Sequence, residues 1–239
     1  KTWRLVRNRI ADIFDEKYSK LRDNAKDKDI IIFRMEDVEM QLPVLIGDYT
    51  DFYSSKEHAT NVGKMFRDPE NALLPNWLHI PVGYHGRSST IVPSGIPVHR
   101  PMGQMLPNGE TSPVFGSSRS VDFELETAFI TTDVNIMGEN ILITEAHEYI
   151  FGMVLLNDWS ARDIQKWEYV PLGPFLAKNF ATSISPWIVT MDALEPFRTK
   201  GPKQEPTPLP YLQQKGKHSY DINLQVAIQP ENSEATVVS

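Results

Sequence analysis

The stretch from Phe151 to Asp158, FGMVLLND, indicates the fold class. Its first six residues, Phe151 to Leu156, form a continuous apolar run with the length of one strand, and such a run predicts a strand buried inside a domain. Asp158 follows two residues later, so it should stand at the end of that strand. Strand ends are common places for sites, and an unpaired carboxylate at a buried position is costly. We therefore expect a β-rich core with a polar site at one edge.

A second strand is predicted upstream, where residues 121–130 alternate between apolar and polar. Glu124 and Glu126 share one face of it. Two carboxylates that close repel each other unless a cation lies between them or one is protonated. With Asp158 they form a set of hard oxygen ligands suited to Mg²⁺, Ca²⁺ or Mn²⁺ rather than zinc. Two alternatives stay open: the glutamates line a solvated face, or Asp158 caps the segment 160–167.

Asp51 and His58 form another candidate cluster. Ser54 and Ser55 precede Lys56-Glu57-His58 and are suitable N-caps for a helix that would carry His58. Asp51 lies in the loop just before it and could complete the metal set, while His58 acts as a base. The alternative is that His58 is a surface or capping residue.

Three hydrogen-bond donors, Arg162, Gln165 and Lys178, follow Asp158 in the sequence. Near a metal they would stabilise an anionic intermediate. The alternative is ordinary salt bridging.

Periodicity and turn residues predict the remaining elements. A boundary between two domains is expected near Pro43, and residues 74–113 are expected to be irregular with short strands such as 90–92. We predict helices at 3–24 and 145–149, strands at 30–33, 38–42, 186–189, 222–228 and 236–239, and an extended loop at 201–210.

Composition excludes several classes of protein. Of 239 residues, 41% are hydrophobic and 23% charged, which is typical of a globular chain, and the net charge of −7 argues against a broad basic face for nucleic acid. The absence of cysteine excludes disulfides and thiolate zinc sites. No apolar run approaches the roughly 20 residues that span a bilayer. We therefore expect a soluble, cytosolic protein with no membrane or nucleic-acid partner.

Five longer motifs resemble the fumarylacetoacetate hydrolase family, and above all its fumarylacetoacetase branch. The resemblance covers almost the whole chain and is strongest from Leu42 to Tyr211. The motifs are GDYTDFYSS at 47–55, HATNVG at 58–63, LPNWLHIPVGYHGR at 74–87, NDWSARDIQ at 157–165 and WEYVPLGPF at 167–175.

The resemblance implies a mixed α+β, mainly β fold: residues 1–43 as the remnant of an N-terminal SH3-like barrel with its linker, then a β-roll catalytic domain at 44–239. It also implies a homodimer and a chain that lacks both ends of the family's polypeptide. The C-terminal glutamate that orients the histidine in the family has no match here, so we expect this fragment to bind metal but to hydrolyse little. Ala177 and Ala181 stand where glycine is expected, which would shift the loop 178–182 if those positions need positive φ or a close approach of the backbone.

Residue roles follow from the same resemblance. The implied metal ligands are Asp51, Glu124, Glu126 and Asp158, with Asp158, Lys178 and Thr182 at a second ion. The implied catalytic residues are His58, Arg162, Gln165 and Lys178, and the substrate-contacting residues are Tyr53, Arg67, Tyr84, Gln165 and Tyr169.

The implied reaction is hydrolysis of a β-diketo acid: cleavage of the carbon–carbon bond of 4-fumarylacetoacetate to fumarate and acetoacetate, the last step of tyrosine and phenylalanine catabolism. Mg²⁺ and/or Ca²⁺ is the implied cofactor. The alternatives are a related acylpyruvate hydrolase or decarboxylase, a non-enzymatic Ca²⁺-binding module, and an inactive fragment.

Overall fold

The structure, a computed structural model, describes residues 2–132 and 135–238. The chain divides into two units, residues 1–41 and residues 42–239. Each has its own local structure, and the polar site lies within the second unit. None of the described helices is long and apolar enough to cross a membrane.

The first unit is helical in its described residues, with α1 (Thr2–Phe14), α2 (Ser19–Arg22), α3 (Ala25–Ile31) and a 3-10 turn at Met35–Asp37. The prediction of one helix up to Asn24 is wrong, because the chain turns after Phe14. There the side chain of Asp15 accepts a hydrogen bond from the backbone N–H of Lys17 at 2.8 Å, a local bond that competes with helix continuation.

The two strands predicted in this unit are also wrong. Ile30 and Ile31 belong to α3, whose first turn is capped by Asn24: its Oδ1 accepts from the N–H of Asp27 at 3.1 Å. A favourable cap and the helix-forming residues after it outweigh the β-propensity of the isoleucines. Residues 38–42 form no strand.

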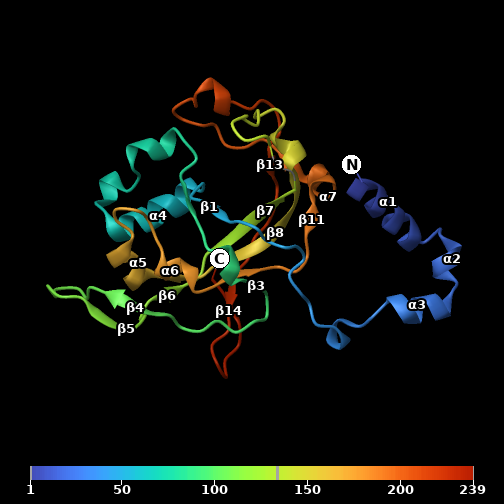
Figure 1. Ribbon diagram of the computed structural model, residues 1–239, viewed down its shortest axis with the longest axis horizontal. Helices are drawn as coiled ribbons and strands as arrows, with labels where there is room; N and C mark the ends of the chain where they lie inside the picture. The colour runs from blue at the N-terminus through green and yellow to red at the C-terminus, as the bar shows by residue number, and fades with distance from the viewer. Residues whose placement is uncertain (1, 133–134, 239) are drawn as a thin grey trace. The chain divides into compact units, whose positions relative to one another are not determined.

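A five-stranded sheet organises the second unit (Figure 1). Its path runs β11 (Val189–Thr190), β8 (Ile150–Asp158), β10 (Thr182–Ile184), β3 (Ile91–Pro93), and β7 (Leu125–Thr131) also pairs with β8. β8 is antiparallel to β7, β10 and β11, and β10 is parallel to β3. The predicted strand at 151–156 is confirmed, but it is buried on one face only: Val154, Leu156 and Asp158 are buried, whereas Leu155 is 50% exposed.

Two apolar cores support the sheet and its neighbours. The first consists of Ile91, Val154, Leu156 and Ile184, with Tyr49 among the partly buried side chains packed against it. Burying each such aliphatic side chain contributes roughly 1.5–3 kcal/mol. The second core joins β4 (Met102–Met105) to α5 (Arg162–Glu168) and α6 (Leu176–Asn179) through Met105, Ala161, Ile164, Ala177 and Phe180.

Helix α4 (Lys56–Phe66) is positioned next to the sheet by a cap and a close contact. Ser55 accepts a hydrogen bond from the N–H of His58 at 3.2 Å, as the sequence predicted. Gly63 permits the helix to approach the following loop, because a Cβ there would lie 2.2 Å from the carbonyl oxygen of Ala72. Before α4, β1 (Thr50–Phe52) pairs with β2 (Gly83–His85) and places Asp51 opposite Tyr84.

The other elements are short, and several sequence predictions fail there. The predicted long strand at 222–228 is wrong: only β14 (Ala227–Ile228) forms, paired with β15 (Thr236–Val237), and Ser239 lies outside the described residues. Of 186–189, only Val189 is in a strand. The loop at 201–209 is confirmed. The remaining elements are β5 (Val114–Ser117), β6 (Val121–Asp122), β9 (Ser160–Ala161), β12 (Arg198–Thr199), β13 (Ser219–Tyr220), α7 (Met191–Leu194) and 3-10 turns at Pro69–Asn71, Pro75–Leu78, Ser88–Thr90, Ala146–Tyr149, Glu195–Phe197 and Pro210–Leu212.

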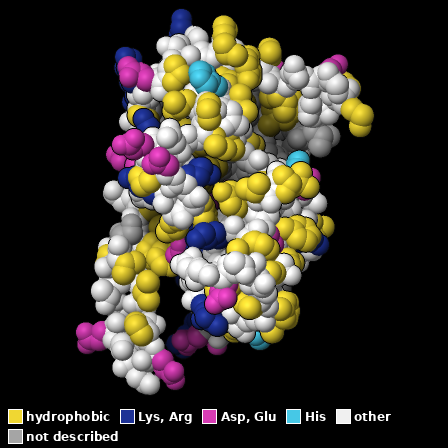
Figure 2. Space-filling view, turned by 90° about the vertical axis from the view of Figure 1, so that its left-hand side faces the viewer, with side chains coloured by type: hydrophobic (Ala, Val, Ile, Leu, Met, Phe, Trp, Pro, Cys, Tyr) yellow, Lys and Arg dark blue, Asp and Glu magenta, His cyan; other side chains and the backbone are white. Residues whose placement is uncertain are grey.

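Apolar side chains remain at the surface of the second unit. Figure 2 shows hydrophobic groups spread over the viewed face, interrupted by clusters of both charges. On the central sheet, Phe129 of β7 is 50% exposed, like Leu155 of β8. One face of the sheet therefore presents apolar side chains that the described residues leave uncovered.

Candidate active site

Three carboxylates from three strands converge at one end of β8. Asp51 of β1, Glu126 of β7 and the terminal Asp158 of β8 each offer an oxygen within 4.8 Å of the other two. Oδ2 of Asp158 accepts hydrogen bonds from the Tyr84 hydroxyl at 3.3 Å and from Nζ of Lys178 at 2.5 Å. Oδ1 of Asp158 is buried and has no hydrogen-bond partner among the described residues. The cluster therefore has an unused acceptor inside the protein.

Burial and mutual repulsion disfavour the charged forms of these acids. Burial, together with the charges of Asp51 and Asp158, raises the pKa of Glu126 to about 9. Burial raises the pKa of Asp158 to about 7, although the nearby Lys178 opposes the shift. The pKa of Asp51 is raised as well, again chiefly by burial. A cation among the three would remove this penalty.

Glu124 lies outside that group of three and contacts cations instead. Its carboxylate is 2.6 Å from Nη2 of Arg162 and 2.9 Å from Nζ of Lys178. Burial opposes ionisation here too, but the contact with His58 and the charges of Lys178 and Arg162 lower the pKa of Glu124. Glu124 sits between β6 and β7, where its N–H donates to Oδ1 of Asn157 and its carbonyl accepts from Asp158. The two glutamates of one predicted strand thus have opposite electrostatic environments.

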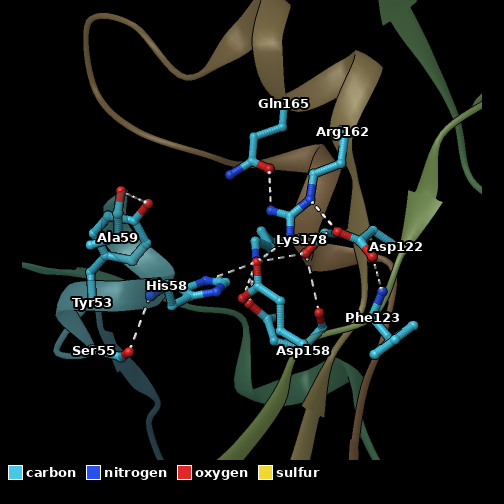
Figure 3. Close-up of polar contacts among 12 residues, drawn as sticks. Tyr53, Ser55, His58, Ala59, Asp122, Phe123, Asp158, Arg162, Gln165 and Lys178 are labelled. Carbon is cyan, nitrogen blue, oxygen red and sulfur yellow. Dashed lines mark hydrogen bonds and ion pairs between the residues drawn. The ribbon is translucent and has the colours of Figure 1, made fainter. Parts of the chain in front are cut away.

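His58 extends from the first turn of α4 toward this cationic group (Figure 3). Its Nε2 is buried and lies 3.5 Å from Oε1 of Glu124. The ring meets Tyr53 edge to face at 5.6 Å between centroids. The imidazole is therefore held between the Tyr53 ring and the Glu124 carboxylate.

The three predicted oxyanion donors are brought together by α5 and α6. Nη1 of Arg162 donates to Oε1 of Gln165 at 3.0 Å, and Lys178 is buried between Glu124 and Asp158. Burial alone would lower the pKa of Lys178, but the two carboxylates raise it, so it stays charged. The residue that precedes α5 is Ala161, and no side chain caps the helix. This rules out Asp158 as the cap of α5.

The predicted substrate contacts already have protein partners. The Tyr53 hydroxyl donates to the carbonyl of Ala59 at 3.3 Å, and burial, followed by the charge of Glu124, raises its pKa to about 12. Nε and Nη2 of Arg67 donate to the carbonyl of Ala72 at 3.0 and 2.7 Å. Tyr169 stacks on Phe66 with centroids 5.3 Å apart. A cavity of about 350 Å³ opens beside Arg162. Phe66 lines it, whereas Asp51, Glu126 and Asp158 do not.

Thr182 and the two alanines at positions where glycine was expected are all buried. Thr182 is buried in β10 and lies opposite Asp158 in the strand register. Ala177 and Ala181 are buried, and neither has a positive φ. Positive φ is therefore not a cause of the expected shift of the loop 178–182.

Sequence reasoning missed two residues near the site. The hydroxyl of Tyr49 is buried without a hydrogen-bond partner among the described residues, and burial followed by the charge of Asp51 raises its pKa. Asp122 holds Arg162 at 2.9 Å. A signal existed for Asp122, since it shares the alternating polar face with Glu124 and Glu126. The sequence holds no such signal for Tyr49, because its position depends on packing against Gly86. A Cβ at Gly86 would lie 2.1 Å from the Tyr49 ring.

Comparison with known proteins gives a consistent result. The family described as "Fumarylacetoacetate (FAA) hydrolase C-terminal" matches residues 48–236. Fumarylacetoacetase of Homo sapiens is 56% identical over 96% of this chain and 55% of its own length, and that of Dictyostelium discoideum is 56% identical over 99% and 56%.

The chain spans about half the length of the curated relatives it matches. Among solved structures, 5-carboxymethyl-2-hydroxymuconate delta-isomerase from Mycobacterium smegmatis aligns over 66% of this chain and 52% of its own, with 22% identity and a TM-score of 0.40. The match over 48–236, with its mixed, mainly sheet architecture, means that this chain belongs to the fumarylacetoacetate hydrolase family.

Proposed function

We propose that this chain carries the catalytic site of a metal-dependent fumarylacetoacetase. The reaction is hydrolysis of 4-fumarylacetoacetate to fumarate and acetoacetate, the last step of tyrosine and phenylalanine catabolism. The observation that carries the proposal is the placement of three converging carboxylates beside His58 and the buried cations Arg162 and Lys178. The names of the similar proteins point to the same substrate.

The carboxylate cluster fits a hard divalent ion. Asp51, Glu126 and Asp158 are partly or fully buried, repel one another, and include the unused acceptor Oδ1 of Asp158. Such an oxygen set suits Mg²⁺ or Ca²⁺. Glu124 is proposed as a fourth ligand that shares its carboxylate with Lys178. At a second ion, Lys178 would have to offer its backbone carbonyl, since its ammonium group has no lone pair, and Thr182 its hydroxyl.

The bound ion supplies Lewis-acid polarisation of a diketone oxygen. His58 accepts a proton from water, whose oxygen bonds to the carbonyl carbon. Arg162, Gln165 and Lys178 donate hydrogen bonds to the resulting oxyanion. When the carbon–carbon bond breaks, its electron pair stays on the leaving carbon, which takes up the proton that His58 accepted from water. Water is thereby consumed with no oxidation or reduction. Tyr53, Arg67, Tyr84, Gln165 and Tyr169 are the proposed substrate contacts.

Assembly and location are further parts of the proposal. The uncovered apolar face that includes Phe129 and Leu155 supports a homodimer or docking of other parts of a longer polypeptide. A β-roll catalytic domain, an SH3-like N-terminal origin for residues 1–43 and a cytosolic location follow from the resemblance alone.

A substrate panel tests the function. Purified complete protein with Mg²⁺ or Ca²⁺ should consume fumarylacetoacetate, followed by the loss of ultraviolet absorbance of the diketone, and should release equal amounts of fumarate and acetoacetate. Preference for acylpyruvates would indicate the related hydrolase instead. Saturable Ca²⁺ binding with no turnover of any diketo acid would indicate a binding module.

A further inference from the structure

Asp122 is an acidic residue beside the site that has no part in the chemistry proposed above. Its Oδ2 accepts from Nε of Arg162 at 2.9 Å and lies 2.9 Å from Nη2 of the same side chain. Its Oδ1 accepts from the backbone N–H of Phe123 at 2.9 Å. Both oxygens are engaged, so the orientation of the carboxylate is fixed from two sides (Figure 3).

Main-chain hydrogen bonds hold together the two segments that carry Asp122 and Arg162. β6, which carries Asp122, pairs with β9 so that Asp122 lies opposite Ser160. The N–H of Arg162 donates to the carbonyl of Ser120 at 2.9 Å. The segments on both sides of the ion pair are therefore joined by main-chain hydrogen bonds, and the pair is preorganised rather than formed between two mobile side chains.

The contacts of Arg162 leave one donor available. A guanidinium has five N–H groups. Nε faces Asp122, Nη2 lies between Asp122 and Glu124, and one N–H of Nη1 donates to Gln165. Among the described residues, the second N–H of Nη1 has no partner. It is therefore the donor of Arg162 that remains available for a substrate oxygen.

We propose that Asp122 is a positioning residue: it holds the guanidinium of Arg162 so that the free N–H of Nη1 points at the oxyanion of the reaction. This rests on the proposed function. The competing account is an ordinary ion pair at the edge of the site, since the Asp122 side chain is 37% exposed, and such pairs contribute little. The buried position of the Arg162 side chain, 11% exposed, argues for the positioning role.

A double-mutant cycle in the complete, metal-loaded protein separates the two accounts. Asp122→Asn should lower kcat about 10-fold with KM changed less than about 2-fold, as expected when an orienting partner is lost. In an Arg162→Ala background the same substitution should cost less than about 2-fold, because it acts only through the arginine. Glu195→Gln is the matched control, since it removes the carboxylate of an Arg198 ion pair outside the site; it should leave kcat unchanged.

The outcomes separate this inference from the proposed function. An active protein in which Asp122→Asn costs the same factor in both backgrounds, or nothing in either, overturns the positioning role alone. A protein that cleaves no diketo acid overturns the proposed function and the positioning role with it. Should thermal melting show that Asp122→Asn does not fold, the cycle is run with Asp122→Glu, which keeps the charge but moves it by one methylene. It should again lower kcat only when Arg162 is present.

Discussion

Glu124 and Glu126 are two residues apart, yet they belong to two different halves of the site. Glu126 faces Asp51 and Asp158, and its pKa is raised to about 9, first by burial and then by these like charges. Glu124 faces Arg162, Lys178 and His58, whose contact and charges outweigh burial and lower its pKa. Lys178 contacts Asp158 of the first half as well as Glu124 of the second, and the second half also holds Arg162. The compensating charge thus differs between two neighbouring carboxylates, and we expect Glu126 to contribute more to the binding of a cation than Glu124.

The largest expected effect on turnover comes from substituting His58, which lies beside Glu124. His58→Ala should lower kcat by about 10³-fold, because a positioned general base contributes on that order. Metal affinity should change little, since His58 contacts Glu124 and not the carboxylate cluster. Turnover and calorimetric Ca²⁺ titration of the same preparation check both parts. Retained activity would remove His58 from the chemical step.

The next largest effect is expected on metal affinity, when Glu126 and Glu124 are substituted in turn. Glu126→Gln should weaken Ca²⁺ or Mg²⁺ binding by about 100-fold or more, beyond what loss of an outer-shell contact costs. Glu124→Gln should weaken it less, since Lys178 and Arg162 already neutralise that carboxylate. Isothermal titration of the two variants measures the difference. Equal losses would erase the distinction between the halves and make Glu124 a full ligand.

Much of the site was predictable from sequence, because strands and caps obey local rules. The alternation at 121–130 predicted that Glu124 and Glu126 share a face, and Ser55 correctly marked the helix that carries His58. The ion pairs of Glu124 with Arg162 and Lys178 were not predictable in the same way, because Lys178 reaches Glu124 from a helix more than fifty residues downstream. The strand errors at 30–33 and 222–228 have a different cause: short apolar runs fit helix and strand equally until a cap or a partner strand decides.

The guanidinium of Arg67 donates to the carbonyl of Ala72 and lies outside both halves of the site. Its substitution therefore tests substrate binding separately from the two glutamates. Arg67→Ala should raise KM about 10-fold with kcat nearly unchanged, as expected for a cation that binds the distal carboxylate of the substrate. It should also lower stability by about 1–2 kcal/mol, because two hydrogen bonds to the carbonyl of Ala72 are lost. Steady-state kinetics and a urea melt check these. A large loss of kcat with unchanged KM would place Arg67 in the chemical step.

A further effect is the pH dependence of stability. Glu126 and Asp158 have pKa values of about 9 and about 7 in the fold, above the values of 4.5 and 3.8 from which they are raised. The folded state therefore binds more protons between about pH 4 and 9, and the metal-free protein should lose stability as pH rises through that window, by at most about 1.4 kcal/mol per pH unit for each group.

Saturating Ca²⁺ should flatten this slope. Urea melts at pH 5, 7 and 9, with and without the ion, measure it. Metal-free stability that rises with pH would contradict the account that burial and mutual repulsion outweigh the charge of Lys178 at these carboxylates.

The position of a bound ion tests the central claim most directly. Crystals of the complete protein grown with Ca²⁺ should show one strong anomalous peak about 2.3–2.6 Å from carboxylate oxygens of Asp51, Glu126 and Asp158. Oδ1 of Asp158, the buried oxygen without a partner, should be among the ligands. No peak at this cluster, or an ion held elsewhere in the second unit, would contradict the assignment of these three carboxylates as the metal site.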